Sequence, residues 1–407
     1  MHRSHRPVIG LTAVALAAAA GLSACSSNNG GSGTKTDAAS SSCGTVPTKL
    51  PQDPDGVLAA LPSQYQSLYN GYSTPVYKSS WASWKPARTA GFTVGVSLSE
   101  TNNGYQVALE NLLEADLKAA GYTVDLSISS DQVTDQIADF NQMVERHVDL
   151  IVYEPLSGSA FTSAVDGAQA AGIPSISILN AVDDKNTVSL VPNAWDQGAQ
   201  MAAYVAKQIG GSGKVLDVHG ISGVSIDTDT FAGVKAAFAE CSGISTDDSL
   251  VDQFADSTAK TVVETYLETH PQKIAAAITS GAGATGVLDG FQAAGKSVPI
   301  IANDSLEEGE MAYWNANKAS YKGVGITSPP NAVAQDTTTV IKDLLAGDGV
   351  KLSAIMLDAP LVTDDNLAQW MQAGWTQSTA GNAGGPAGFT MLPSALLNAV
   401  LTDPSGS

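Results

Sequence analysis

Residues 92–128 decide the fold, and they read FTVGVSLSETNNGYQVALENLLEADLKAAGYTVDLSI. Residues 92–98 and 122–128 are short, mainly apolar runs, which is typical of strands that are covered on both faces. Between them, residues 107–120 repeat apolar side chains at helical spacing. The apolar face of this segment consists of Leu109, Leu112, Leu113, Leu117 and Ala120. The pattern predicts a strand–helix–strand unit with parallel strands.

The same alternation continues along the chain in two series. The first series predicts further helices at 131–146 and 158–171 and strands at 150–153 and 176–179. The second begins near Trp195 and predicts helices at 195–209, 229–239, 257–270 and 283–294 and strands at 214–218, 250–254, 274–279 and 298–302. We therefore expect an α/β protein with two doubly wound, Rossmann-like lobes. Its ligand should bind in a central cleft, at the carboxyl ends of the strands.

The first 24 residues are typical of a signal peptide. Arg3 and Arg6 precede an apolar run at 8–20 that is too short to span a bilayer. The small residues before Cys25 resemble the lipobox of bacterial lipoproteins, in which this cysteine is lipidated and becomes the N-terminus. The alternative is a plain secretory signal that happens to contain a cysteine. Residues 25–42 are rich in Ser, Gly, Asn and Thr, and we expect them to form a lipidated, flexible tether.

The chain is strongly acidic. Its 407 residues include 20 Lys and Arg and 40 Asp and Glu, for a formal charge of −20, and only Arg3, Arg6, Arg88 and Arg146 are arginines. Removal of the signal peptide leaves 18 basic residues and a charge of −22. Because this charge repels phosphate backbones, we expect no nucleic-acid partner. The scarcity of arginine also argues against bidentate recognition of a phosphate or carboxylate ligand.

Apart from the predicted lipidation site Cys25, the exported part of the chain contains two cysteines, Cys43 and Cys241. An even number of cysteines in an exported protein favours a disulfide. The alternative is two unpaired thiols. We expect no metal site, because His147, His219 and His270 share no ligand spacing with each other or with cysteine.

Both flanks of the α/β region have a different composition. Residues 43–91 form an extension whose aromatic residues we expect to pack along the surface of a lobe, with an extra ligand wall as the alternative. The aromatic residues of this extension are Tyr65, Tyr69, Tyr72, Tyr77, Trp81 and Trp84. Residues 360–407 form a C-terminal extension with a Gly-rich link at 381–388 and a short apolar helix around Leu396, and we interpret it as surface packing.

Four segments together resemble the type I periplasmic sugar-binding proteins, the ribose-binding-like receptors of ABC importers. They are residues 96–105 (VSLSETNNGY), 172–174 (GIP), 270–271 (HP) and 300–304 (IIAND). The resemblance covers about 92–360. It implies an exported, monomeric binding lipoprotein that delivers its ligand to a membrane permease, with no enzymatic activity and no cofactor.

The resemblance also implies the limits of the lobes. Lobe 1 comprises 92–192 and 328–359, and lobe 2 comprises 193–327. The crossings near Asn193, Ser328 and Pro360 form a hinge, and closure of this hinge would bury the ligand.

Position by position, the resemblance implies a site with aromatic and polar parts. Tyr105 and Phe254 match residues that stack on a sugar ring, and Asp304 matches the carboxylate of the family. Asn180 and Thr228 stand where the ribose-type pattern has arginine, so we do not expect ribose itself. The implied ligand contacts are Ser99, Asn103, Tyr105, Gln106, Asn180, Thr228, Phe254, Ser280, Asp304 and Thr327.

These side chains favour a small neutral sugar, sugar alcohol or cyclitol. Asp304 can accept two hydroxyl hydrogen bonds, and the aromatic faces suit C–H surfaces. An anion would meet this carboxylate without a guanidinium to compensate. Asp227 and Asp229 could instead bind an amine or replace the missing arginine pair, but we favour Asp229 as the acidic residue at a helix N-terminus.

Other classes of protein compete with this interpretation. Residues 281–286 (GAGATG) fit the G-x-G-x-x-G pattern of dinucleotide-binding enzymes, with Asp304 in the position of the acidic partner, but the match lies deep in the series. A hydrolase is disfavoured because no G-x-S-x-G occurs. A two-lobed repressor needs a basic helix-turn-helix, which does not suit this acidic chain. A receptor that reports to a membrane sensor remains the main alternative to a transport component.

Overall fold

The computed structural model describes residues 42–99, 104–129, 132–221 and 223–402, which belong to one unit of the chain. The predicted signal peptide, Cys25 and Asn103 lie outside the described residues. None of the described helices is both long and apolar enough to cross a lipid bilayer.

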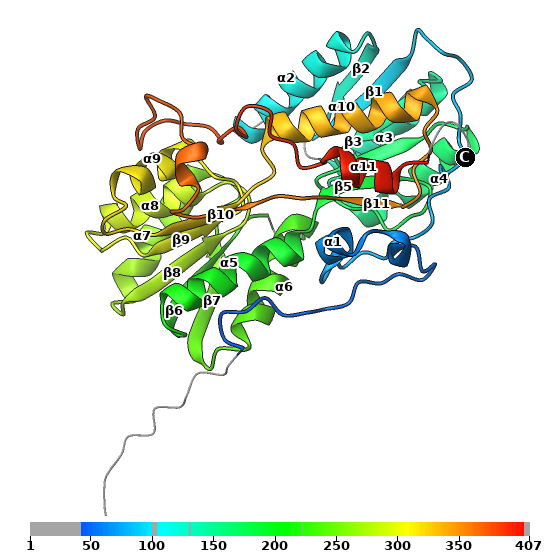
Figure 1. Ribbon diagram of the computed structural model, residues 1–407. Coiled ribbons are helices and arrows are strands. Elements are labelled where there is room, and N and C mark those ends of the chain that lie inside the picture. The colour runs from blue at the N-terminus through cyan, green and yellow to red at the C-terminus, as the bar shows by residue number, and fades with distance from the viewer. Residues whose placement is uncertain (1–41, 100–103, 130–131, 222, 403–407) are drawn as a thin grey trace, which may run out of the picture. The chain divides into compact units, whose positions relative to one another are not determined.

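The first lobe is built on a sheet of six parallel strands in the order β11-β5-β4-β3-β1-β2 (Figure 1). The strands are β1 (Thr93–Leu98), β2 (Thr123–Ile128), β3 (Leu150–Tyr153), β4 (Ser175–Ile178), β5 (Val188–Pro192) and β11 (Ala354–Leu357). The helices that cover them are α2 (Gly104–Ala119), α3 (Val133–Glu145), α4 (Thr162–Ala170) and α10 (Pro330–Ala346). Helices α2 and α10 share one apolar core with the sheet, and α3 and α4 share another on the opposite face.

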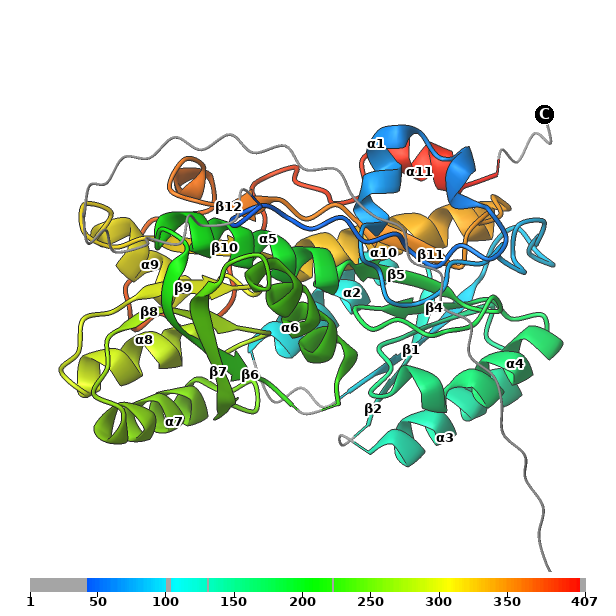
Figure 2. The ribbon, with the colours of Figure 1, turned by 90° about the horizontal axis from the view of Figure 1, so that it is seen from below.

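The second lobe repeats this plan with the strand order β12-β10-β9-β8-β6-β7 (Figure 2). Its strands are β6 (Ser212–His219), β7 (Gly243–Val251), β8 (Ile274–Thr279), β9 (Ile300–Asn303), β10 (Gly323–Ile326) and β12 (Leu361–Val362). Its helices are α5 (Ala194–Gln208), α6 (Ser225–Phe238), α7 (Asp256–Thr269), α8 (Ala284–Ala293) and α9 (Glu308–Ala316). All described pairs are parallel except β10 with β12. Helices α5 and α6 cover one face, and α7, α8 and α9 cover the other.

The doubly wound α/β class predicted from the sequence is confirmed. The repeating apolar face of α2 packs as expected, with Leu109, Leu113 and Leu117 fully buried. Several elements differ from the prediction, α6 and β7 among them. Helix α6 begins at Ser225 rather than at residue 229, and β7 occupies Gly243–Val251 rather than 250–254. Since β7 is an edge strand with mostly polar, accessible side chains, it lacks the apolar run by which a buried strand is recognised.

The chain passes between the two sheets at three places. It does so between β5 and α5 around Asn193, between β10 and α10 at residues 327–329, and between β11 and β12 at residues 358–360. These short connections run beside the carboxyl ends of β5, β10 and β11, so the lobes are joined close to the edges where a ligand would bind.

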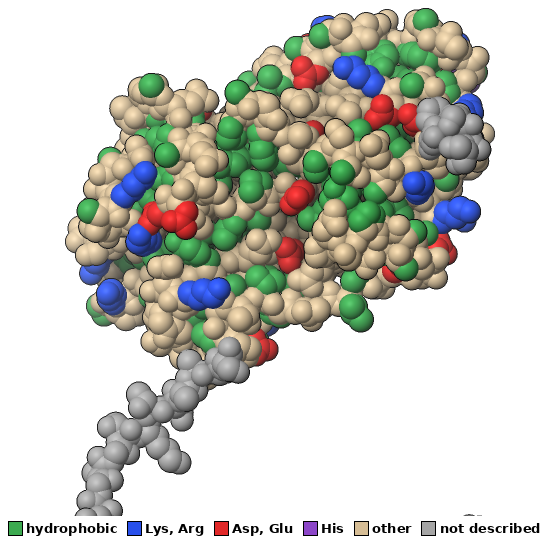
Figure 3. All heavy atoms as spheres, viewed as in Figure 1, with side chains coloured by type: hydrophobic (Ala, Val, Ile, Leu, Met, Phe, Trp, Pro, Cys, Tyr) green, Lys and Arg blue, Asp and Glu red, His purple; other side chains and the backbone are tan. Residues whose placement is uncertain are grey.

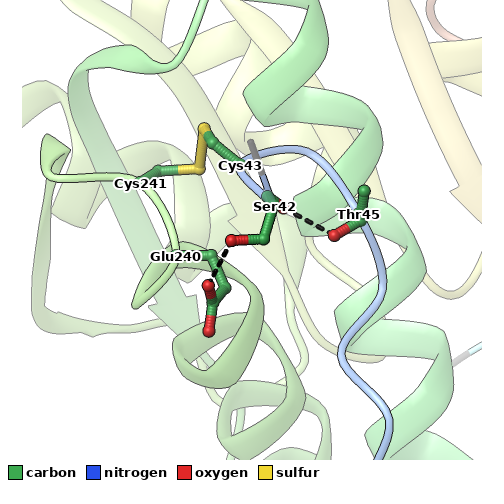
Figure 4. Close-up of a disulfide and its surroundings, with 5 residues drawn as sticks. All are labelled: Ser42, Cys43, Thr45, Glu240 and Cys241. Carbon is green, nitrogen blue, oxygen red and sulfur yellow. Dashed lines mark hydrogen bonds between the residues drawn. A yellow bond between two sulfur atoms is a disulfide. The ribbon is translucent and has the colours of Figure 1, made fainter. Parts of the chain in front are cut away.

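Residues 43–91, the N-terminal strap, contact both lobes rather than lying along one. Their first residue, Cys43, forms a disulfide with Cys241, just beyond α6 of the second lobe (Figure 4). This is the pairing that the cysteine count predicts. Ser73 then donates a hydrogen bond to Asp229 on α6 at 2.8 Å. Four residues before Ser73, the Tyr69 hydroxyl donates to the carbonyl of Ala354 in β11 of the first lobe.

The aromatic side chains of the strap serve packing. Tyr69, Tyr72 and Trp81 are buried in the core that the strap shares with α2 and α10. Trp81 also donates its indole N–H to the carbonyl of Asn186 at 2.7 Å. The strap covers an apolar face that a bare lobe would expose to water.

Residues 360–402, the C-terminal segment, are more than the surface packing that their composition suggests. Strand β12 adds an edge strand to the second sheet, and Leu367 and Trp370 are buried in the core of that lobe. Helix α11 (Ser394–Val400) then buries Leu396 and Val400 in the core of the first lobe. The segment therefore crosses from one lobe to the other, and its apolar residues are divided between two distant cores.

Candidate functional site

A cavity of about 130 Å³ lies where the carboxyl ends of strands from both lobes converge. It is the site expected for a doubly wound α/β protein. Residues of the first lobe and its crossings that line it are Tyr105, Gln106, Glu154, Leu179, Asn180, Pro192 and Ser328. The second lobe contributes Gln197, Val224, Ile226, Phe254, Gly281, Ala282, Asp304 and Ser305, and the C-terminal segment contributes Asn382.

A larger cavity, of about 800 Å³, lies at the opposite ends of the strands in the second lobe. It is lined by the segments that precede β6, β8 and β9 and includes Lys273, Lys296 and Lys322. Basic side chains at this end complement the negative ends of the helix dipoles. Because ligands of open α/β sheets bind at the carboxyl ends instead, we assign the smaller cavity as the candidate site.

Asp304 is the central charged group of the site. It follows β9 directly and is only 8% exposed. Its carboxylate accepts a hydrogen bond from the backbone N–H of Gly281 and another from the Thr230 hydroxyl at 3.4 Å. Burial raises the pKa of Asp304 to about 7, and the nearby Asp227 also raises it, whereas the Gly281 bond acts in the opposite direction. Near neutral pH this carboxyl group can therefore gain or lose a proton.

Phe254 presents its ring to the cavity from a constrained turn. Both Gln253 and Phe254 have positive φ angles, 58° and 55°, which L-residues adopt at a cost. The Asp252 carboxylate accepts the backbone N–H of Phe254 at 2.8 Å and stabilises the turn. The ring lies against Gly220 and Gly281, where an added Cβ would come within 1.7 Å and 2.5 Å of it. The backbone of these two glycines thus allows the ring to lie at the wall of the site.

The first lobe contributes Tyr105 and Gln106 from the first turn of α2. The Tyr105 hydroxyl donates to the carbonyl of Ser328 at 2.7 Å, which ties α2 to the crossing after β10. Gln106 donates its amide to a carboxylate oxygen of Glu154 at 2.9 Å. Glu154 follows β3 directly and is 6% exposed. The site therefore contains a second buried carboxylate, which the sequence analysis missed.

The remaining predicted contacts divide into two groups. Asn180 lines the cavity with Tyr105, Gln106, Phe254 and Asp304. The described residues that do not line it are Ser99, Thr228, Ser280 and Thr327. Thr228 is directed elsewhere, because its hydroxyl bonds to the carbonyl of Val224 one turn back along α6.

Ser280 does not line the cavity but forms a hydrogen bond to a second buried residue, Asp227. Its hydroxyl donates to Asp227 at 2.8 Å, and Asp227 also accepts the backbone N–H of Gly220 and bonds to the ring of His219. Burial acts to raise the pKa of Asp227, but these hydrogen bonds hold it below its usual range. In turn, the hydrogen bond to Asp227 raises the pKa of His219.

The assignment of Asp229 as a helix N-terminal acid is wrong. Helix α6 begins at Ser225, so the acidic residue in its first turn is Asp227. Asp229 lies further along the helix and binds Ser73 of the N-terminal strap. Ser225 and Ile226, which the prediction left in the preceding loop, are the first two residues of the helix.

The structure argues against a dinucleotide site at residues 281–286. Glu307 accepts the backbone N–H groups of Gly283 and Thr285, both at 2.6 Å, and Asp256 accepts that of Gly286 at 2.8 Å. A phosphate would need these donors. Since two acidic side chains already accept from these donors, the donors are not free to bind a pyrophosphate.

The charge of the site suits an uncharged polar ligand. Among the described residues that line the cavity, none is Lys, Arg or His, whereas Asp304 and Glu154 are acidic. On the face in Figure 3, Lys and Arg side chains are scattered rather than gathered into one patch. No group of three His, Cys, Asp or Glu within the described part of the chain is arranged to hold a metal ion.

Two mainly parallel α/β sheets, three crossings between them and a cavity at the strand ends define a two-lobed solute-binding protein of type I. The family model described as "Periplasmic binding protein domain" matches residues 94–349. The chain therefore belongs to this family of extracytoplasmic binding proteins, and the resemblance to the type I periplasmic sugar-binding proteins is confirmed. The N-terminal strap and the C-terminal segment lie outside the matched residues.

Individual relatives agree with this assignment. The ribose import binding protein of Bacillus subtilis is 26% identical over 285 residues, which are 69% of this chain and 90% of that protein. The fructose import binding protein of Bifidobacterium longum is 29% identical over 279 residues, 64% of this chain and 81% of that protein. A solved solute-binding protein of Bacillus halodurans, with bound myo-inositol, superposes with a TM-score of 0.62 at 19% identity, covering 70% of this chain and 98% of that one.

Proposed function

We propose that this protein captures a small neutral sugar, sugar alcohol or cyclitol outside the cytoplasm and delivers it to the permease of an ABC importer. The observation that carries the proposal is the cavity itself, which Asp304 and Phe254 line together with amides, hydroxyls and several aliphatic side chains, without a basic side chain among the described lining residues. A carboxylate can accept hydroxyl hydrogen bonds, and an aromatic ring can cover the C–H face of a sugar.

The relatives support the ligand class. Those named above are ribose and fructose import binding proteins, and a structural neighbour of this fold holds myo-inositol. Further neighbours hold L-arabinofuranose and D-allose. We infer an uncharged carbohydrate or polyol for this chain, because a phosphate or carboxylate ligand would be buried beside Asp304 and Glu154 with no cation in the described lining.

The proposed contacts are the predicted residues that line the cavity, together with Glu154. Closure of the lobes, with limits at 92–192 and 328–359 for lobe 1 and 193–327 for lobe 2, would bury the ligand between them. We further propose a monomer that is anchored to the outer face of the cytoplasmic membrane through a lipid on Cys25. It requires no cofactor, binds no nucleic acid and catalyses no reaction.

A thermal-shift screen of the exported protein tests the ligand class. The screen contains pentoses, hexoses, polyols and inositols, with sugar phosphates and amino acids as controls. We expect at least one neutral compound to raise the melting temperature in proportion to the logarithm of its concentration. Stabilisation by a phosphate or an amino acid, with no response to any neutral sugar or polyol, would contradict the proposal.

A sensor role is the second candidate. One structural neighbour, at 18% identity and a TM-score of 0.59 over 68% of this chain and 92% of its own, is a fructose-binding periplasmic domain of a hybrid two-component system. Deletion of the gene separates the two roles. Loss of uptake of the stabilising sugar indicates transport, whereas unchanged uptake with loss of a transcriptional response to that sugar indicates sensing.

A further inference from the structure

Asn382 brings the C-terminal segment into the ligand cavity. It lines the cavity together with Asp304, Ser305 and Ser328. It lies 33 residues beyond the end of the family match at residue 349. The position therefore lies outside the residues that match the family model.

The backbone around Asn382 is held against the loop that carries Asp304. Gly381 accepts the N–H of Glu308 at 2.9 Å, and Ala383 donates its N–H to Leu306 at 2.8 Å. Glu307 and Asn382 form an antiparallel β-bridge between these two bonds. The side chain of Ala383 is fully buried in the core of the second lobe. Asn382 is thus positioned relative to Asp304 by paired backbone.

The side-chain amide of Asn382 can form more hydrogen bonds than the one it makes to the described residues. Its amide nitrogen donates to the carbonyl of Ser305 at 3.3 Å, which is long for such a bond. Its oxygen accepts no hydrogen bond from the described residues. In the same cavity lining, the hydroxyls of Ser305 and Ser328 are buried and likewise have no partner within the described chain. Buried polar groups are normally paired, so this group of side chains is suited to a ligand with hydroxyls.

The same segment continues to the first lobe. Gly385 donates its backbone N–H to the side chain of Asn331 on α10 at 2.9 Å, and Asp336 on the same helix accepts the N–H of Met391 at 2.9 Å. The residues that follow Asn382 therefore connect the second lobe to the first. A ligand that bonds to Asn382 would be held by Asp304, by the hinge and by this additional crossing.

We propose that Asn382 is a ligand contact that selects among neutral sugars by hydrogen bonding to one hydroxyl group. This inference rests on the proposed function. The oxygen and nitrogen of a side-chain amide in a fixed position form hydrogen bonds only along certain directions. Such an amide therefore binds an epimer whose hydroxyl points toward it better than one whose hydroxyl points away.

Titration calorimetry on the full exported chain tests the proposal. The panel is D-ribose, D-fructose, D-allose, L-arabinose, myo-inositol and glycerol. We expect Asn382→Ala to weaken binding of the tightest panel compound by roughly three- to tenfold, as for one hydrogen bond. Asn382→Gln keeps the amide but moves it by one methylene, and it should change the order of affinities within the panel. Both variants should melt at the wild-type temperature without sugar.

Gln377→Ala is the matched control. Gln377 is an amide of the same segment, but it binds Asp289 and Gln292 on α8 and does not line the cavity. Its variant should bind every panel compound as the wild type does. Affinities within twofold of the wild type for both Asn382 variants would overturn the role of Asn382 and leave the proposed function intact. A wild-type protein that binds no panel compound would instead refute the ligand class on which both depend.

Discussion

The hydroxyl of Ser225 donates a hydrogen bond to the side-chain oxygen of Asn180 at 2.9 Å. Ser225 is the first residue of α6 in the second lobe, and Asn180 follows β4 in the first. Asn180 also lines the cavity. The two lobes are therefore in contact beside the ligand site, and this contact would have to break when the lobes separate.

Loss of this contact should favour the open form. We expect Ser225→Ala to weaken sugar binding by about three- to tenfold, because the closed form loses one hydrogen bond that the open form does not have. Small-angle scattering at saturating sugar should show compaction of the wild type, and the variant should need more sugar to reach it. Thr228→Ala on the same helix is the control. Identical affinities for Ser225→Ala and wild type would show that the contact does not contribute to closure.

Sugar binding should weaken below neutral pH. The pKa of Asp304 is about 7 because the group is buried, and a protonated carboxyl group accepts hydroxyl hydrogen bonds less well. Affinity should be full above pH 8 and fall as the pH drops through 7, by up to about tenfold per pH unit. Asp304→Asn should bind weakly at every pH. An unchanged pH profile in this variant would assign the dependence to a group other than Asp304.

Removal of the Asp304 side chain should be costly. We expect Asp304→Ala to reduce the free energy of sugar binding by about 2–4 kcal/mol, because the ligand loses a charged acceptor and its hydroxyls lose their partner. Tyr105→Ala should cost less, about 1–2 kcal/mol, since it removes mainly apolar contact. Calorimetry against the tightest sugar of the screen measures both, and equal losses would contradict the central role of the carboxylate.

Folding stability should decrease from pH 5 to pH 8. Burial raises the pKa of Asp217 and Glu310 to about 7 and that of Asp252 to about 8. Each of these groups holds its proton in the folded protein at pH values where the unfolded chain has released it. Their contribution is therefore complete below about pH 4 and is lost as the pH rises through 7–8, at up to about 1.4 kcal/mol per pH unit for each group. Thermal unfolding at constant ionic strength measures the trend. Asp252→Asn should make it shallower, and a rise in stability toward pH 8 would contradict the prediction.

The disulfide should stabilise the exported protein. Cys43 and Cys241 are 198 residues apart in the sequence, and closure of so long a loop lowers the entropy of the unfolded chain by an amount worth at most about 5 kcal/mol. Unreduced peptides should contain the linked pair, and reductant should lower the melting temperature. The double variant Cys43→Ser/Cys241→Ser should melt lower and be insensitive to reductant. Quantitative alkylation of both thiols without reductant would show that the bridge does not form.

The membrane anchor depends on one residue outside the described part of the chain. We expect the wild-type protein to sediment with membranes and Cys25→Ser to lose this association, because acyl chains supply about 0.8 kcal/mol per buried methylene. Mass spectrometry of the N-terminal peptide should show the added lipid. A wild-type protein that is recovered free in the medium would favour the plain secretory signal.

Much of the fold could be predicted from the sequence because strand and helix periods are local. For example, the apolar run at 150–153 and the leucine face around Leu113 are each recognisable from neighbouring residues alone, and both are buried in the structure. The helix and strand assignments fail where local signals are weak, as in the polar edge strand β7. The disulfide could also be predicted from the sequence, because only two cysteines follow the predicted signal peptide and tether.

The candidate site was predictable only in part. Asp304 and Phe254 were found through a family pattern, and both line the cavity. Glu154 was missed, although its position directly after a buried strand is a signal that could have identified it. Gln197 and Asn382 carry no comparable signal, because one lies inside a helix and the other in a Gly-rich link outside the matched residues.

The amino-acid sequence was sufficient to predict the doubly wound class, the two series of units and the acidic, arginine-poor character that disfavours an anionic ligand. Three features became visible in the folded chain alone: which strand ends meet, the hydrogen bond from Ser280 to Asp227 in place of a cavity contact, and the passage of both flanking segments between the lobes. The physical reason is the range of the interactions. Periodicity reflects neighbours within a few residues, whereas the cavity is assembled from side chains as far apart in the sequence as Tyr105 and Asn382, whose meeting depends on the packing of the whole chain.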